Sequence, residues 1–281
     1  MKQDFLKFIA KIFIPSKRLR TKIKNQINFS YLYPIKAYPL FFKRMFDADY
    51  SSLKGKKSDK VVYTVITGGY NNLFPLLYYD TGWDYVCFTD DENLIKSGHK
   101  FWQIRPLENT ELDKAKLSRL PKILAHKFLT DYKYSLYIDG NIDIISNKLF
   151  KNVNQFVKSG VKLAITKHFK RDCIYDEIEA CLNSGKESAQ NVKKLLQIFK
   201  KEGFPTHLGL KENNIIFRQH NDEEIIKLME QWWNLVENYS KRDQLSLMYV
   251  LWKNNYKDVL DIMDKPVRFC SDDFIFKGHN K

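Results

Sequence analysis

The chain has 281 residues, of which 44% are hydrophobic, and a net charge of +14. This length suits one large α/β domain or two small ones, and the apolar content can furnish a real core. A membrane-spanning protein and a protein with a zinc or redox motif are not expected. No stretch approaches the ~20 continuous apolar residues of a membrane span, and the four cysteines lack the short spacing of a zinc or redox motif. The basic charge favours anionic partners, although scattered surface lysines explain it about equally well.

The N-terminal 28 residues alternate apolar and basic side chains, and a polybasic run follows Pro15. This composition is typical of a helix lying in the interface of an anionic membrane. The alternatives are an amphipathic helix packed on the domain and, third, a nucleic-acid arm. The segment is unlike a cleavable signal peptide. Residues 1–58 are therefore predicted to form a basic appendage and linker, and residues 59–281 the catalytic-type domain.

A strand is predicted over residues 61–67, directly before Gly68, Gly69 and Tyr70. The glycines allow a ligand to approach the main chain, and Tyr70 could stack on a base. A plain tight turn explains the two glycines about as often.

A second strand over residues 83–88 precedes Asp90 and Asp91, which are candidates for binding a ribose or base. The alternative is that they cap the following helical turn. A third strand is predicted near residues 101–104, and a helix over residues 111–129 with a break at Pro121. Arg119 and Lys122 on this helix could neutralise a diphosphate, or be solvated surface residues.

The strand predicted over residues 134–138 ends in the cluster Asp139, Asn141 and Asp143. Ligands bind at the carboxyl ends of strands in open α/β sheets, and grouped hard oxygen ligands suit Mg²⁺ or Mn²⁺. The alternative is a simple Asx-type turn. The three side chains share one side only if the chain stays extended, and Gly140 can break that register.

A further strand over residues 161–166 leads to His168 and Arg171, candidates for proton transfer and phosphate binding. A structural role for His168 is at least as expected. Asp243 and Gln244 precede an apolar helix near residues 245–252, where Asp243 either caps the helix or is presented into a cleft. Strands that end in polar loops, with helices between them, predict a single α/β domain with a mainly parallel sheet flanked by helices; the resemblance described below implies that this domain is Rossmann-related. No P-loop or dinucleotide-binding glycine motif is present.

The order of these motifs resembles the GT-A class of nucleotide-sugar glycosyltransferases. It most closely resembles a glycosyltransferase-like family shared by a plant seed-mucilage transferase and many bacterial polysaccharide-cluster proteins. The resemblance covers about residues 60–255 and rests on Ile-Asp-Gly-Asn (residues 138–141), on His168 to Glu177, and on Arg242 to Gln244.

The resemblance implies that residues 139–141 occupy the place of the Asp-x-Asp metal and diphosphate motif, with Asn141 replacing the second acid. Asp143 could then share the metal, and His279 near Gly278 and Lys277 loosely matches a residue that completes the metal shell in some GT-A enzymes. In an inverting reaction Asp243 would be the base, with His168 second; in a retaining reaction Asp243 and Gln244 would line the reacting face.

The implied activity is transfer of a sugar from a nucleotide-diphosphate donor, with a divalent cation, to a saccharide or lipid-linked acceptor of a cell-surface polysaccharide or lipopolysaccharide. A cytoplasmic protein bound peripherally to the inner face of the membrane is expected, with no nucleic-acid partner. The alternatives are a non-catalytic basic protein that binds membrane or RNA, a sugar-nucleotide hydrolase, and a lipid-modifying enzyme.

Overall fold

The computed structural model describes residues 37–46, 49–53, 58–108, 111–265, 267 and 271–277. The predicted membrane-binding segment and His279 lie outside these residues. Among the helices in the described ranges, none combines the length and the apolar character that crossing a bilayer requires.

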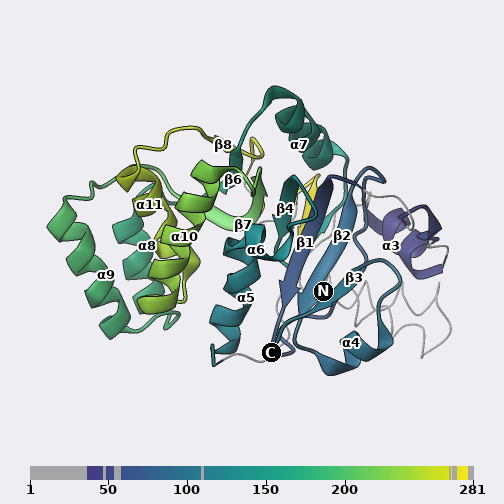
Figure 1. Ribbon diagram of the computed structural model, residues 1–281, viewed down its shortest axis with the longest axis horizontal. Helices are drawn as coiled ribbons and strands as arrows, with labels where there is room; N and C mark the ends of the chain where they lie inside the picture. Colours follow the sequence, from purple (N-terminus) through teal and green to yellow (C-terminus); the bar gives the residue numbers. More distant parts are fainter. Residues whose placement is uncertain are drawn as a thin grey trace, which may run out of the picture.

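A seven-stranded sheet forms the centre of the protein, with strand order β3-β2-β1-β4-β7-β6-β8 (Figure 1). All its neighbouring pairs are parallel except those made by β7, which runs antiparallel to both β4 and β6. The predicted α/β class with a mainly parallel sheet is therefore confirmed. The strands are β1 (Lys60–Ile66), β2 (Asp84–Thr89), β3 (Gln103–Pro106), β4 (Tyr134–Ile138), β6 (Leu163–Lys167), β7 (Lys211–Arg218) and β8 (Val259–Asp261). Two short strands, β5 (Ile142–Ile144) and β9 (Phe274–Phe276), pair antiparallel beside it.

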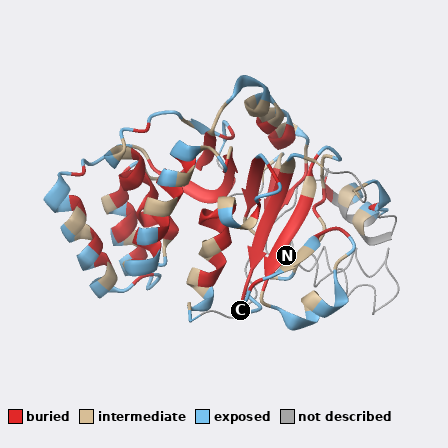
Figure 2. Ribbon diagram, in the orientation of Figure 1, coloured by how far each residue is buried: buried red, intermediate tan, exposed pale blue. Residues whose placement is uncertain are grey.

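Helices cover both faces of the sheet, and the central strands are buried (Figure 2). Strand β1 shows why, because its β-branched and aromatic residues alternate between two cores. Val61 and Tyr63 join the core under α5, α6 and α8 to α11, whereas Val62 joins the core under α7. The helices are α3 (Ala37–Phe46), α4 (Glu92–Ser97), α5 (Lys114–Ile123), α6 (Ala125–Phe128), α7 (Lys148–Ser159), α8 (Ile174–Asn183), α9 (Ala189–Glu202), α10 (Glu223–Asn238) and α11 (Leu247–Lys253), with 3₁₀ turns η1 (Ser51–Leu53) and η2 (Asp243–Leu245).

Helix α5 differs from the prediction, because it continues through Pro121 and ends only at Ile123. A proline removes one helical hydrogen bond, here the one to the Leu117 carbonyl. Leu117, Pro121 and Ile123 are all buried, and this packing compensates for the missing bond. The prediction of a break at Pro121 was therefore wrong, and the turn to α6 comes at Leu124.

Part of the predicted linker packs on the domain. Tyr50 is buried in the α7-side core, where its ring meets Phe101 edge-on with centroids 5.0 Å apart. Arg44 on α3 reaches the carbonyl of Pro75 at 2.9 Å. The described residues before position 59 thus contact the sheet domain.

The end of α5 is held by Arg218 at the end of β7. Its side chain is fully buried, and its guanidinium donates to the carbonyls of Lys122 at 2.6 Å and Ile123 at 3.0 Å and to the hydroxyl of Tyr63. A helix leaves its last carbonyls without partners, and a cation there also complements the helix dipole. Arg218 therefore fixes where the last turn of α5 sits on the sheet.

We expect Arg218→Met to lower the free energy of unfolding by about 3 kcal/mol, because it strands several buried acceptors. Urea denaturation at neutral pH measures this. Arg105→Met is the matched control, since Arg105 is partly exposed and donates to a single carbonyl, that of Phe128; it should cost about 1 kcal/mol or less. Equal losses in the two variants would contradict the anchoring role of Arg218.

Candidate active site

The turn after β4 carries the predicted metal and diphosphate motif. The amide of Asp139 donates to the carbonyl of Asn214 on β7, and that of Ile142 donates back to Asp139 across the turn. Gly140 is packed closely, since a Cβ there would lie 3.3 Å from the side chain of Ile66. The chain therefore turns tightly, and the extended register that would align positions 139, 141 and 143 does not occur.

Lys122 on α5 reaches this turn from the helix side of the sheet. Its side chain is only 4% exposed, and its ammonium lies 2.8 Å from the Asp243 carboxylate and 3.5 Å from that of Asp139. The ammonium also lies 4.7 Å from the centre of the Tyr137 ring. Lys122 therefore lies at the end of β4, and Asp243 joins it there.

Asp243 is held as a carboxylate. Burial alone would raise the pKa of its carboxyl, but the charges of Lys122 and Arg119 outweigh burial and lower the pKa to about 2. In the structure Asp243 is therefore a charged partner of two cations, Lys122 and Arg119.

Arg119 lies on the same side of α5, with its guanidinium 3.7 Å from Asp243. Burial would lower the pKa of Arg119, but nearby groups raise the pKa on balance: Asp243, Tyr137, Asp139 and Tyr70. The Tyr137 hydroxyl donates to Asp139 at 2.6 Å. Helix α5, strand β4 and turn η2 therefore build one network of Arg119, Lys122, Tyr137, Asp139 and Asp243, which we call the α5 network.

The ends of β1 and β2 meet the first turn of α5. Gly68 and Gly69 both have positive φ, 61° and 66°, which favours glycine. The amide of Gly68 donates to Asp90 at 2.9 Å, and the ammonium of Lys114 lies 2.7 Å from the same carboxylate. Although burial raises the pKa of Asp90, Lys114 and Gly68 lower it on balance. Asp90 therefore ties two strand ends to α5.

Tyr70 and Asp91 have different surroundings: Tyr70 is exposed, whereas Asp91 caps a helix. Tyr70 is 58% exposed and follows the glycine turn, so its ring faces solvent. Asp91 accepts hydrogen bonds from the amides of Asn93 and Leu94 and caps α4. The capping alternative therefore holds for Asp91, and its predicted role toward a ribose is not supported.

His168 and Arg171 form a structural cluster with Glu177. The buried His168 accepts from the amides of Lys170 and Arg171 through Nδ1, and its Nε2 lies 3.5 Å from Glu177. Arg171 binds the same carboxylate at 2.6 Å. Burial would raise the pKa of Glu177, but its interactions with His168 and Arg171 lower the pKa on balance. Both ring nitrogens are engaged, so the structure argues against His168 as a base and places Arg171 on a carboxylate rather than on phosphate.

Asp143 does not share the position of Asp139. Its buried carboxylate lies 3.2 Å from Arg44 and 3.1 Å from Lys277. Burial would raise the pKa of Asp143, but these two cations lower it on balance. Its charge is already balanced inside the protein, so its prediction as a metal ligand does not fit the geometry.

Asp139 and Asn141 do fit a divalent cation. The Asp139 side chain is 36% exposed, and the buried Oδ1 of Asn141 has no hydrogen-bond partner among the described residues. Mg²⁺ and similar ions are often held by one or two protein oxygens, with water and substrate phosphates completing the shell. Within the described ranges no cluster of three or more His, Cys, Asp or Glu side chains could hold a metal.

Further buried amides surround the turn. Within the part of the chain that the structure describes, neither amide atom of Asn213 has a partner, and neither do the Oδ1 of Asn214 and the Nε2 of Gln244. Buried polar groups are normally hydrogen-bonded, so each calls for an explanation. A polyhydroxylated ligand would supply donors and acceptors to this set.

Lys114 and Asn214 were not predicted as site residues. Asn214 lies next to Asp139 only because β7 pairs antiparallel with β4, and sequence periodicity does not reveal strand partners. Lys114 had a visible signal, since Asp113 caps α5 and thereby places Lys114 in its first turn.

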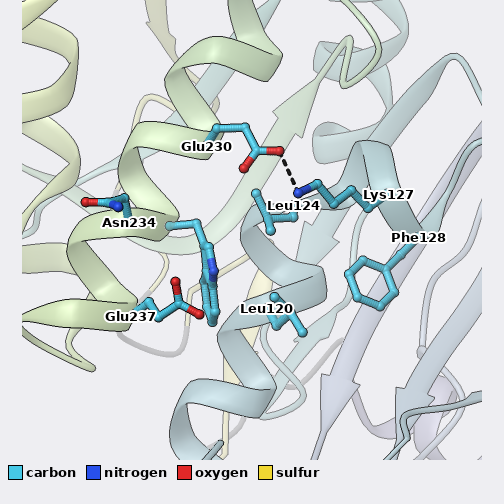
Figure 3. A pocket seen from close by; sticks show the side chains of 8 residues that line it. Leu120, Leu124, Lys127, Phe128, Glu230, Asn234 and Glu237 are labelled. Atoms are coloured by element: carbon cyan, nitrogen blue, oxygen red, sulfur yellow. Dashed lines mark ion pairs between the residues drawn. The ribbon is translucent and has the colours of Figure 1, made fainter. Parts of the chain in front are cut away.

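A separate cavity of about 470 Å³ lies between α5, α6 and α10 (Figure 3). The one lysine at its wall, Lys127, is paired with Glu230 at 2.8 Å. Glu237 adds a second carboxylate, so the cavity is unsuited to a diphosphate. It is lined by Leu120, Leu124, Lys127, Phe128, Glu230, Trp233, Asn234 and Glu237, none of them a predicted site residue.

Comparison with known proteins gives a family match and distant structural likenesses. A family model described as TOD1/MUCI70, glycosyltransferase-like domain, matches residues 87–268, more than half of the chain. The probable hexosyltransferase MUCI70 of Arabidopsis thaliana is 26% identical in an alignment of 189 positions that covers 59% of this chain and 32% of that protein. The matched part thus spans about a third of the curated relative.

Among solved structures, mouse xyloside xylosyltransferase 1 is 9% identical, with a TM-score of 0.42 over 73% of this chain and 85% of that one. The glycosyltransferase GlyE of Streptococcus pneumoniae TIGR4 is 10% identical, with a TM-score of 0.42 over 74% and 46%. Likenesses with TM-scores this low do not bear on function.

We expect the stability contributed by Asp243 to depend on pH. Its carboxyl pKa falls from 3.8 to about 2 on folding, so the contribution is full above about pH 4 and is lost as the pH falls toward 2, a change of about 2 kcal/mol. Urea unfolding of wild type and Asp243→Asn measures the difference between their unfolding free energies across this pH range.

The exposed Asp172, paired with His207, supplies the control: Asp172→Asn should leave the unfolding free energy close to that of wild type. If the difference in unfolding free energy between wild type and Asp243→Asn stays constant down to about pH 2, Lys122 and Arg119 do not hold the carboxylate in its charged form.

Proposed function

The chain belongs to the TOD1/MUCI70 glycosyltransferase-like domain family, and we propose that it transfers a sugar from a nucleotide-diphosphate donor to a saccharide or lipid-linked acceptor. The single observation that carries the proposal is the α5 network, set beside the Asp139–Asn141 turn at the edge of the sheet. The relative in Arabidopsis is named a probable hexosyltransferase, which agrees with a hexose donor.

Charge balance supports a diphosphate bound together with a divalent cation. In the α5 network the cations Arg119 and Lys122 are balanced by the carboxylates Asp139 and Asp243. A sugar-linked diphosphate carries two negative charges, which this balanced set alone does not neutralise. When bound at Asp139 and Asn141, a divalent cation supplies the two missing positive charges and stabilises the departing phosphate.

In the reaction, the bond between the anomeric carbon and the β-phosphate oxygen breaks, and its electron pair stays on that oxygen. The acceptor oxygen bonds to the anomeric carbon, and its proton passes to water. The leaving diphosphate gains one negative charge, so preorganised cations beside it lower the barrier. Lys122 is preorganised in this sense, because its buried ammonium lies 2.8 Å from the Asp243 carboxylate, and the partly exposed Arg119 lies 3.7 Å from the same carboxylate.

Asp243 and Gln244 then have positioning roles. With a carboxyl pKa of about 2, Asp243 stays charged and orients the two cations. The Nε2 of Gln244 and the amide of Asn213 are buried without hydrogen-bond partners among the described residues, and we propose that sugar hydroxyls supply those partners. This agrees with a reacting face lined by residues 243 and 244.

We further propose that the protein acts at the inner surface of the cell membrane, in the synthesis of a cell-surface polysaccharide. The support is the alternation of apolar and basic residues in residues 1–28. A lipid-linked acceptor would be concentrated at the same surface.

Thermal-shift assays with UDP, GDP, CDP and ADP, each with and without Mn²⁺ or Mg²⁺, test the donor site. We expect one of these nucleotides to raise the unfolding temperature, and to do so more strongly with the metal. Asp139→Asn should remove the metal-dependent part of the shift, and Lys122→Met should weaken nucleotide binding about 10-fold or more.

Glu230 lies in the separate cavity, so Glu230→Gln is the control. This variant should leave the nucleotide-dependent rise in unfolding temperature unchanged. No shift with any of these nucleotides would refute the donor site. If the protein hydrolyses a nucleotide sugar at a rate that added glycan or lipid-linked acceptors do not lower, it would instead be a hydrolase.

Flotation with liposomes that contain anionic lipid tests the membrane proposal. The full chain should float, and a chain lacking residues 1–28 should remain in the dense fraction, because the deletion removes the apolar and basic side chains. Flotation that survives this deletion would place the membrane contact elsewhere.

A further inference from the structure

A second buried ion cluster lies on the other side of the Asp139–Asn141 turn, and we call it the Asp143 cluster. It joins three segments that are distant in the sequence, because Arg44 comes from α3, Asp143 from β5 and Lys277 from the residue after β9. Their side chains are only 4%, 2% and 12% exposed. Both cations bind the same oxygen of Asp143, at 3.2 Å and 3.1 Å.

Phe74 lies against both cations of the Asp143 cluster. Its ring centre is 5.4 Å from the Arg44 guanidinium and 5.2 Å from the Lys277 ammonium. Arg44 also donates to the carbonyl of Pro75 at 2.9 Å. The loop that follows the Gly68–Gly69 turn is therefore clamped between α3 and the end of β9.

The Asp143 cluster abuts the proposed metal and diphosphate turn directly. The amide of Lys277 donates to the carbonyl of Asn141 at 2.7 Å. Asp139, Gly140, Asp143, Lys277 and Phe74 are among the residues that line one small cavity of about 10 Å³, roughly the volume of one water. Movement of Lys277 would therefore displace the backbone that carries Asn141.

Asp143 keeps two cations together that would otherwise repel each other. The Asp143 carboxylate lies 3.2 Å from the Arg44 guanidinium and 3.1 Å from the Lys277 ammonium. Loss of Asp143 would leave two buried cations without their shared partner, which is strongly destabilising. Loss of Arg44 would detach helix α3 from Asp143 and from the Pro75 carbonyl, and the contact between Lys277 and Asn141 would loosen.

We propose that Arg44 is a positioning residue of the metal and diphosphate turn, acting through Asp143 and Lys277, so that helix α3 is part of the catalytic unit. The inference rests on the proposed function. Arg44 and Lys277 both lie outside residues 87–268, which the family model matches, so the family match does not imply it.

Isothermal titration of the full chain with inorganic pyrophosphate, and with the nucleotide that gives the largest thermal shift, tests this role at saturating Mn²⁺. We expect Arg44→Met to weaken Mn²⁺-dependent diphosphate binding by about 10- to 100-fold, as loss of an outer partner of a metal site does. Arg44→Lys keeps the charge and should restore most of this affinity. Asp143→Asn should match Arg44→Met, and the double variant should be no weaker than either, because both act through one contact.

Lys43→Met removes the neighbouring exposed cation from the same helix and should bind like wild type. If Arg44→Met does not fold, Arg44→Lys and Asp143→Asn carry the test, with folding checked by near-ultraviolet circular dichroism. Wild-type affinity in a folded Arg44→Met or Asp143→Asn variant would overturn the inference and leave the proposed function standing. A wild-type chain that binds no diphosphate with any metal would overturn both.

Discussion

The buried ion pair between Lys122 and Asp243 is the constraint on which the candidate site depends. A lysine with a side chain only 4% exposed requires a carboxylate close by, since an unpaired buried charge is costly. Meeting this requirement brings turn η2 against helix α5, although they are far apart in the sequence. Arg218 fixes the backbone of the same lysine through its carbonyl. Both ends of Lys122 are thus held, and the ammonium points at the end of β4.

This arrangement explains how the end of strand β4 differs from a simple turn. Lys122 and Tyr137 both contact Asp139, which orients its carboxylate while leaving part of it exposed. Asn141 is buried, and its amide oxygen has no hydrogen-bond partner among the described residues. A structural Asx turn would use that oxygen internally. The partly exposed acid and the unsatisfied amide together favour a ligand site at this position.

Much of the fold could be predicted from the sequence, because β-branched and aromatic runs define the strands and parallel strands place their carboxyl ends at one edge. That logic brought Asp139, Lys122 and Arg119 into one corner correctly. It failed where an alternative use of a side chain depends on tertiary partners. The sequence does not reveal that Asp243 is paired with two cations more than 100 residues earlier. Nor does it reveal that Asp143 is buried between Arg44 and Lys277, which lie about 100 residues or more away in the chain.

The turn at Gly140 divides the acidic cluster between two faces of the sheet. On one side Asp139 meets the α5 network, and on the other Asp143 meets Arg44 and Lys277. Asn141 lies between them, with its backbone carbonyl bound by the amide of Lys277. The two ion clusters therefore hold the same short turn from opposite sides. Because each cluster recruits a distant segment, η2 on one side and α3 with β9 on the other, the geometry of the proposed metal site is set by the whole domain rather than by its local motif.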